Sequence, residues 1–113
     1  MATVILQLDP AKLGNPDLDI RYVLPDLIVK RSGGRLADDG YDYIGKGAAA
    51  CLLLFLRTEN ADASIPAVVE VLKSERVLGN DLSDVAVAIE DGDSFRVVYP
   101  PGFHGTFPRR DDR

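Results

Sequence analysis

The segment from residue 40 to residue 47 matches a phosphate-binding loop, G-x-x-x-x-G-K, up to its last position. Such a loop needs a hydroxyl after the lysine to hold magnesium, and Gly47 has none. It should also follow a buried strand and open a helix, whereas the preceding residues are polar and the interior of the motif alternates like a strand. We therefore predict a hairpin turn at Gly45–Gly47 and no nucleotide site.

The chain has one cysteine, Cys51, and one histidine, His104, the residue types that serve as nucleophile and base in a cysteine enzyme. Cys51 lies in the apolar run 48–56, where burial raises the pKa of a thiol and blocks access to it. His104 lies in a glycine-rich tail, and one histidine with one cysteine cannot form an ordinary metal site. We expect a core cysteine, a loop histidine, no catalytic residue, no metal and no cofactor.

Two groups of carboxylates are the remaining candidates, one around Gly40 and one at a hairpin tip. Neither has the spacing of a calcium loop, and a motif for general acid–base chemistry is missing. They are solvated turn residues, a protein-binding surface or, as a third alternative, groups for general acid–base chemistry, for which no raised pKa can be read from sequence. Two tyrosines flank the first group, and interfaces are enriched in tyrosine, although core packing is the alternative. The predicted partner-binding residues are Asp38, Asp39, Tyr41, Asp42 and Tyr43, followed by Glu90, Asp91 and Asp93.

The composition is that of one globular domain. The chain has 113 residues, of which 46% are hydrophobic and 27% charged, with a formal net charge of −5. Residues 58–113 hold eleven acids and six bases. The acidic balance disfavours nucleic acid as a partner. The apolar runs are too short for a membrane helix, and residues 1–9 do not resemble a signal peptide, so we expect a cytoplasmic protein.

Seven elements are expected to position these residues. The apolar stripe from Ile20 to Ile28 predicts a helix that ends at Gly33–Gly34, and Pro25 either kinks it or divides it in two. The second helix is expected to start at Asp62 or Ser64 and to end at Gly79–Asn80. The predicted strands cover residues 3–9, 35–44, 50–57, 84–89 and 94–99.

The turn between the last two strands sets their register. A three-residue loop with a left-handed Gly92 pairs Val87 with Phe95 and places the large apolar side chains of both strands on one face. Replacement of Gly92 by valine should then lower stability.

The order β-α-β-β-α-β-β predicts an α+β fold of the ferredoxin-like, split βαβ type with one extra strand. Both helices would cover one face of an antiparallel sheet and leave the other face open to a second copy or a partner. Residues 1–99 form the predicted domain, and residues 100–113 form an irregular tail.

Three segments, Arg21–Ile28, Ser32–Gly34 and Asp38–Tyr43, resemble small bacterial proteins of the kind that serve as immunity partners of polymorphic secreted toxins. The resemblance implies a non-enzymatic cytoplasmic protein that binds and blocks a cognate toxin, and the acidic surface favours a basic toxin. Two alternatives remain open: a homodimeric ligand-sensing module that pairs through the open sheet face, and a small dimeric α+β barrel enzyme with a polar cavity near Asp42 or Tyr43.

Overall fold

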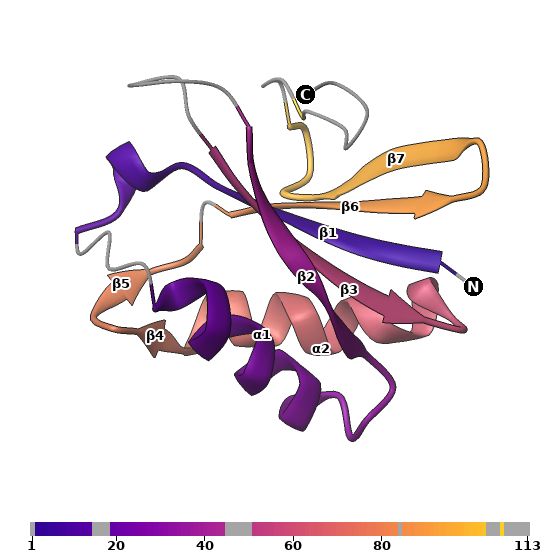
Figure 1. Cartoon of the computed structure of the whole chain (residues 1–113), viewed down its shortest axis with the longest axis horizontal. Coiled ribbons are helices and arrows are strands. Elements are labelled where there is room, and N and C mark those ends of the chain that lie inside the picture. The colour runs from indigo at the N-terminus through magenta and orange to yellow at the C-terminus, as the bar shows by residue number, and fades with distance from the viewer. Residues whose placement is uncertain (1, 15–18, 45–50, 84, 104–106, 108–113) are drawn as a thin grey trace.

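The computed structural model describes residues 2–14, 19–44, 51–83, 85–103 and 107. This part of the chain has an α+β fold with two α-helices and a five-stranded antiparallel sheet in the order β2-β3-β1-β6-β7 (Figure 1). The elements are β1 (Ala2–Leu8), a 3-10 helix (Pro10–Lys12), α1 (Ile20–Arg31), β2 (Ala37–Ile44), β3 (Cys51–Thr58), α2 (Ala61–Ser74), β4 (Arg76–Val77), β5 (Asn80–Asp81), β6 (Ala86–Asp91) and β7 (Ser94–Tyr99).

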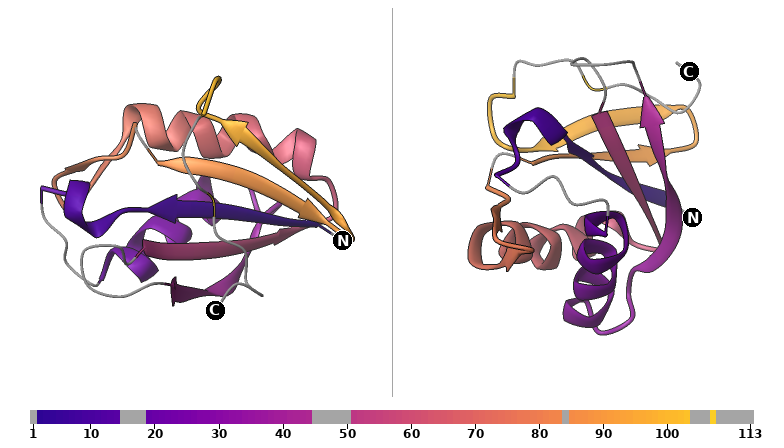
Figure 2. Two further views of the ribbon diagram at one scale, coloured as in Figure 1. Left: turned by 90° about the horizontal axis from the view of Figure 1, so that it is seen from above. Right: turned by 60° about the vertical axis from the view of Figure 1, so that its left-hand side comes forward.

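Both helices lie on the same side of the sheet, as expected (Figures 1 and 2). The alternation of β1 explains this arrangement, because Val4, Leu6 and Leu8 face the helices and are at most 1% exposed. They pack against Leu24 of α1 and Leu72 of α2 in the main hydrophobic core.

The second face of the sheet is covered at its centre, contrary to the expectation of an open face. Ile5, Cys51, Leu53 and Phe55 form a separate hydrophobic cluster there, and each is 8% exposed or less. Phe107, from the segment after the last strand, packs against this cluster. The apolar side chains at the centre of this face are therefore buried within the described part of the chain, and pairing of the face with a second copy stays a prediction.

Helix α1 is one continuous helix that contains Pro25, so the alternative of two short helices is wrong. Its end is a Schellman motif, in which the amide of Gly33 donates to the Lys30 carbonyl and the amide of Gly34 to the Val29 carbonyl. Both glycines have positive φ, which confirms the predicted end of the helix.

Helix α2 begins and ends earlier than the sequence indicates. Its N-cap is Asn60, whose Oδ1 accepts a 3.1 Å hydrogen bond from the Ala63 amide, so neither predicted cap is the N-cap. The helix ends at Ser74. Leu78 and Gly79, both with positive φ, form the turn between β4 and β5 and do not terminate the helix.

The predicted three-residue loop between the last strands is also wrong. The turn contains two residues, Gly92 and Asp93, because Asp91 pairs with Ser94. Gly92 does have a positive φ of 60°, as expected, and this matches a two-residue turn with glycine at its first position. In this register Phe95 lies on the second face of the sheet, in the cluster around Phe55.

The register differs because the sheet has two apolar faces rather than one. Val87 and Ile89 of β6 face the helices, whereas Phe95 of β7 has its own cluster on the other side. A bulge at Val98 then returns Tyr99 to the helix side. The turn at Gly45–Gly47, His104 and most of the predicted tail lie outside the described residues; residues 100–103 belong to no helix or strand.

Candidate binding surface

The exposed large hydrophobic side chains among the described residues are concentrated on α1 and β2. They are Tyr22 (52% exposed), Val23 (42%), Tyr41 (40%) and Tyr43 (39%). The two tyrosines of β2 share one side of the strand, as their spacing predicts, but they are at the surface rather than in the core. We call Arg21, Tyr22, Tyr41 and Tyr43 the tyrosine patch.

The sheet register explains why α1 and β2 bring these rings together. Tyr41 pairs with Leu54 and Tyr43 with Leu52, and both leucines belong to the core beneath the helices. The two tyrosines therefore lie on the helix side of the edge strand, where Tyr22 of α1 reaches them. The ring of Tyr41 lies 6.0 Å from that of Tyr22 and 5.9 Å from that of Tyr43, with edge-to-face geometry in both pairs.

Arg21 contacts all three tyrosines of the patch. Its guanidinium carbon lies 4.8 Å from the ring centre of Tyr22 and 5.1 Å from that of Tyr41, which is cation–π distance. It donates hydrogen bonds to the hydroxyls of Tyr43 and Tyr22, which raise the pKa of Arg21. Within the described residues Arg21 forms no ion pair with a carboxylate. The patch therefore presents a positive charge framed by aromatic rings.

The same contacts are expected to separate the ionisation of two neighbouring phenols. The hydrogen bond that Arg21 donates lowers the pKa of Tyr22, and the hydrogen bond that Tyr41 donates to the Tyr22 oxygen raises the pKa of Tyr41. We expect the first proton lost by this pair on raising the pH to come from Tyr22, below the ordinary tyrosine range. Because the pKa is lower in the folded state, the stabilisation from Tyr22 increases as the pH rises through that folded pKa.

Carbon-13 NMR of ζ-labelled tyrosine checks this order directly. Arg21→Met should return the Tyr22 titration to the ordinary range, and Tyr22→Phe should lower the midpoint of Tyr41. Equal midpoints for Tyr22 and Tyr41 in the native chain would contradict the arrangement.

The carboxylates predicted beside the tyrosines are divided by the sheet. Asp42 pairs with Leu53 and so lies on the face opposite the tyrosine patch. Asp39 approaches Arg57 of β3 at 3.9 Å, and Asp38 accepts a 2.9 Å hydrogen bond from the Gly40 amide within its own turn. The strand is bulged at this point, so the five predicted residues do not form one continuous surface.

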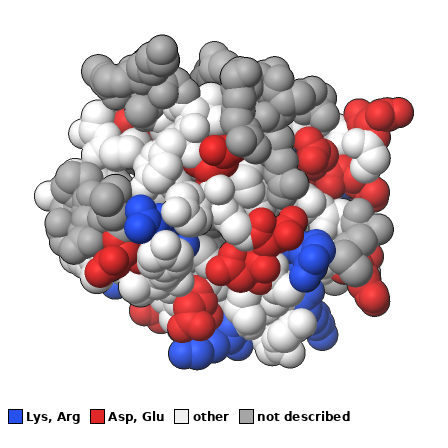
Figure 3. Space-filling view, viewed as in Figure 1, with Lys and Arg blue, Asp and Glu red and all other residues white. Residues whose placement is uncertain are grey.

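The second predicted group lies at the other end of the strand order. Asp91 and Asp93 are exposed at the β6–β7 turn and Glu90 is half-buried, whereas β2 forms the opposite edge of the sheet. Figure 3 shows acidic side chains over the centre of one face and again at its right-hand side, with basic side chains between them. The two groups therefore cannot be parts of one compact site.

The reasoning from sequence missed Arg21 and Tyr22. A usable signal was present, because both lie outside the apolar stripe of the helix, and an aromatic ring outside such a stripe is directed toward solvent or a neighbouring element. What the sequence does not indicate is that this neighbour is β2.

A catalytic or metal centre does not emerge from the described residues. Cys51 is 8% exposed, and burial raises the pKa of its thiol. Within the described ranges there is no group of three or more His, Cys, Asp or Glu side chains placed to hold a metal, and no helix long and apolar enough to cross a membrane. Neither Asp42 nor Tyr43 lines the two surface grooves that lie between the end of α1 and the start of α2.

Comparison of the chain with protein-family models, with curated proteins and with solved structures gives no match.

Proposed function

We propose that this chain is a non-enzymatic protein-binding domain of ferredoxin-like fold, which acts in the cytoplasm as an immunity protein that binds and blocks a cognate bacterial toxin. The observation that carries the proposal is the tyrosine patch: three exposed tyrosines held around one arginine on the surface formed by α1 and β2.

The fold assignment rests on the order of the elements. The sequences β1-α1-β2 and β3-α2-β6 are two β-α-β halves whose strands interleave as β2-β3-β1-β6, with every neighbouring pair antiparallel. This interleaving is the split βαβ plan. Strand β7 is then the extra edge strand, and the β4–β5 pair is an insertion before β6.

The composition and rigidity of the patch suit a protein interface. Tyrosine and arginine are enriched among the residues that contribute most to binding energy. Arg21 already contacts two rings and hydrogen-bonds two hydroxyls, so less side-chain freedom is lost when a partner covers the patch.

The negative charge of the chain favours a basic protein as the partner. The chain has a net charge of −5, and Asp38, Asp39 and Asp42 lie on the strand that carries two of the tyrosines. This negative surface accelerates association with a basic protein and orients it. Arg21 has no carboxylate partner among the described residues, so we expect the toxin to supply an acidic side chain there, within an otherwise basic surface.

The test compares the native chain with a patch variant as two matched affinity matrices. The native chain and the double variant Tyr22→Ala/Tyr41→Ala are immobilised and exposed to extracts of cells that express the genes adjacent to its own. We expect a protein that is retained only by the native chain, and whose toxic activity the native chain inhibits. Each alanine should weaken the measured affinity by about 30-fold or more, because hot-spot residues contribute roughly 2 kcal/mol.

A charge variant separates steering from the contact itself. Asp38→Lys/Asp39→Lys/Asp42→Lys should slow association and reduce its dependence on salt, while dissociation changes less. Asp91→Ala/Asp93→Ala removes acids of the second predicted group, at the opposite edge of the sheet, and is expected to change the affinity much less because the tyrosine patch lies on α1 and β2. A bound protein whose activity is not inhibited, or whose affinity does not change in the tyrosine variant, would overturn the proposal.

A further inference from the structure

Two neighbouring grooves lie where the end of α1, the loop that precedes β2, the end of β3 and the start of α2 meet. The larger has a volume of about 700 Å³, within the range of small-molecule sites, and the smaller about 480 Å³. Both are lined by Arg35, Ala63 and Ser64, so they form one continuous depression. No residue of the tyrosine patch lines either groove.

Arg35, at the junction of the two grooves, is held by ordered backbone on both sides. On one side Gly34 completes the Schellman motif with a φ of 86°. On the other side Leu36 is 1% exposed, and its amide donates a 3.2 Å hydrogen bond to the hydroxyl of Ser32. The position of the Arg35 backbone is therefore fixed, and its exposed side chain extends from a rigid rim.

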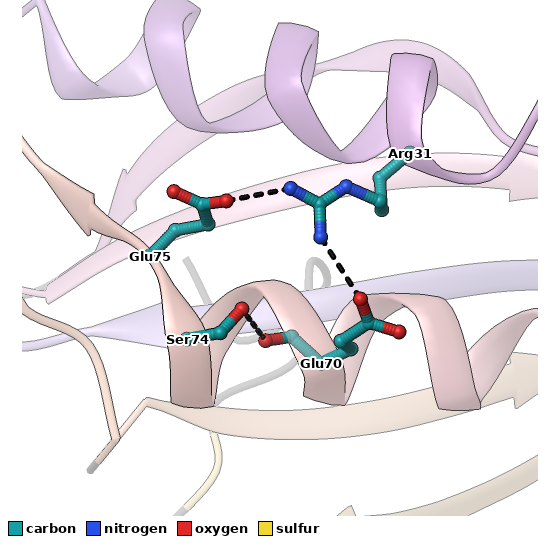
Figure 4. A network of polar contacts seen from close by, with 4 residues as sticks. All are labelled: Arg31, Glu70, Ser74 and Glu75. Atoms are coloured by element: carbon teal, nitrogen blue, oxygen red, sulfur yellow. Dashed lines mark hydrogen bonds and ion pairs between the residues drawn. The ribbon is translucent and has the colours of Figure 1, made fainter.

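Basic side chains outnumber acidic ones among the residues that line the larger groove. Arg31, which lines the smaller groove, is paired with Glu70 at 2.9 Å and with Glu75 at 2.5 Å (Figure 4). Arg35 forms no ion pair with any described residue, and the contact of Arg57 with Asp39 is long, at 3.9 Å. These two arginines face one acid, Glu59, among the residues that line the larger groove.

Apart from the carboxylate of Glu59, the polar side-chain groups that remain available at this groove are hydrogen-bond donors. The hydroxyls of Thr58 and Ser64 lie 3.1 Å apart and satisfy each other. The Oδ1 of Asn60 already accepts from the Ala63 amide, which leaves the NH₂ group of Asn60 as a donor. Guanidinium and amide donors together suit oxygen-rich anions, which arginine binds through two parallel hydrogen bonds.

We propose that the larger groove is a binding site for a small polyanion that carries phosphate or carboxylate groups. Arg35 and Arg57 bind the anion, and Asn60 contributes a neutral donor. The groove shares no residue with the tyrosine patch, although Arg57 approaches Asp39 at 3.9 Å. Variants of Tyr22 and Tyr41 therefore test protein binding without altering a residue of the groove.

The test uses pyrophosphate and citrate as probes, added to the ¹⁵N-labelled full chain at near-physiological salt. We expect saturable shifts of the amides of Arg35, Arg57 and Asn60, and no shifts at Tyr22 or Tyr41. Tighter binding of pyrophosphate identifies a phosphate site, and tighter binding of citrate identifies a carboxylate site. Either result supports the proposal.

Methionine variants test the role of charge at nearly constant side-chain length. Arg35→Met/Arg57→Met should weaken binding at least tenfold, because both charged donors to the anion are lost. The charge of Arg31 is already neutralised by its ion pairs, so Arg31→Met should change the affinity for the anion by less than about threefold. Thermal melts establish whether each variant folds. If the double variant does not fold, the single variant Arg35→Met is used in its place. Shifts that do not saturate, or equal affinity in the native chain and the variant, would rule the site out.

Discussion

Replacement of Phe55 with alanine is expected to lower the free energy of unfolding by about 3–5 kcal/mol, the usual cost of removing a buried aromatic side chain. Phe55 is 4% exposed and lies on the sheet face opposite the helices, across from Ile5, which is 0% exposed. The loss is large because the neighbours in this small cluster cannot close the space without moving the sheet. Urea denaturation followed by circular dichroism measures it.

This substitution distinguishes a covered sheet face from a dimer interface. If the cluster is internal, the stability of the native chain should not depend on protein concentration, and Phe55→Ala should remain in the same oligomeric state. Tyr43→Ala removes an aromatic ring of similar size from the exposed edge of the sheet and should cost well under half as much. A native chain whose melting temperature rises with concentration, together with a Phe55 variant that is dissociated but equally stable, would show that the face pairs with a second copy.

Local signals in the sequence were sufficient for the order of the main elements. Two consecutive glycines after a basic last turn predict the end of α1, and they form a Schellman motif there. The continuous apolar run after Cys51 predicts a strand covered on both faces, and β3 is buried from Cys51 to Leu56. These features depend on residues close together in the chain.

The register of the last two strands could not be obtained in this way. The prediction assumed one buried face and placed Phe95 with Val87, whereas the second apolar cluster around Phe55 gives Phe95 a separate place to pack. That cluster combines residues of β1, β3 and β7, and no short stretch of sequence indicates that it exists. Burial decides register, as assumed, but which faces are buried is a property of the whole sheet.

The candidate site could be predicted only in part, because contacts between separate elements also determine it. Alternation places Tyr41 and Tyr43 on one side of β2, and this is confirmed. Their exposure depends on β2 being an edge strand, and their contacts with Arg21 and Tyr22 depend on how α1 lies against that edge. Spacing along one element does not indicate which residues a neighbouring element brings to it.

The orientation of α1 leads to the second large expected effect: Leu24→Ala should cost about 2–5 kcal/mol, whereas Val23→Ala should change stability by no more than about 0.5 kcal/mol. Leu24 is 0% exposed beneath the sheet, and Val23 is 42% exposed. Alanine also favours the helix over valine, which offsets any contact that Val23 loses. Chemical denaturation of the two variants, with the native chain in parallel, gives the difference.

Comparing Val23 with Leu24 is informative because both residues belong to the apolar stripe, which therefore predicts the same burial for each. A helix centred on the apolar stripe from Ile20 to Ile28 would bury both of them. In the structure the helix is rotated about its axis so that Pro25 is buried in place of Val23, and Arg21 comes within reach of the tyrosines of β2. Equal losses in the two variants would mean that the stripe itself faces the core, and Arg21 would then be turned away from Tyr41. The tyrosine patch and the low cost of Val23→Ala thus depend on the same rotation of α1, and one pair of denaturation curves tests both.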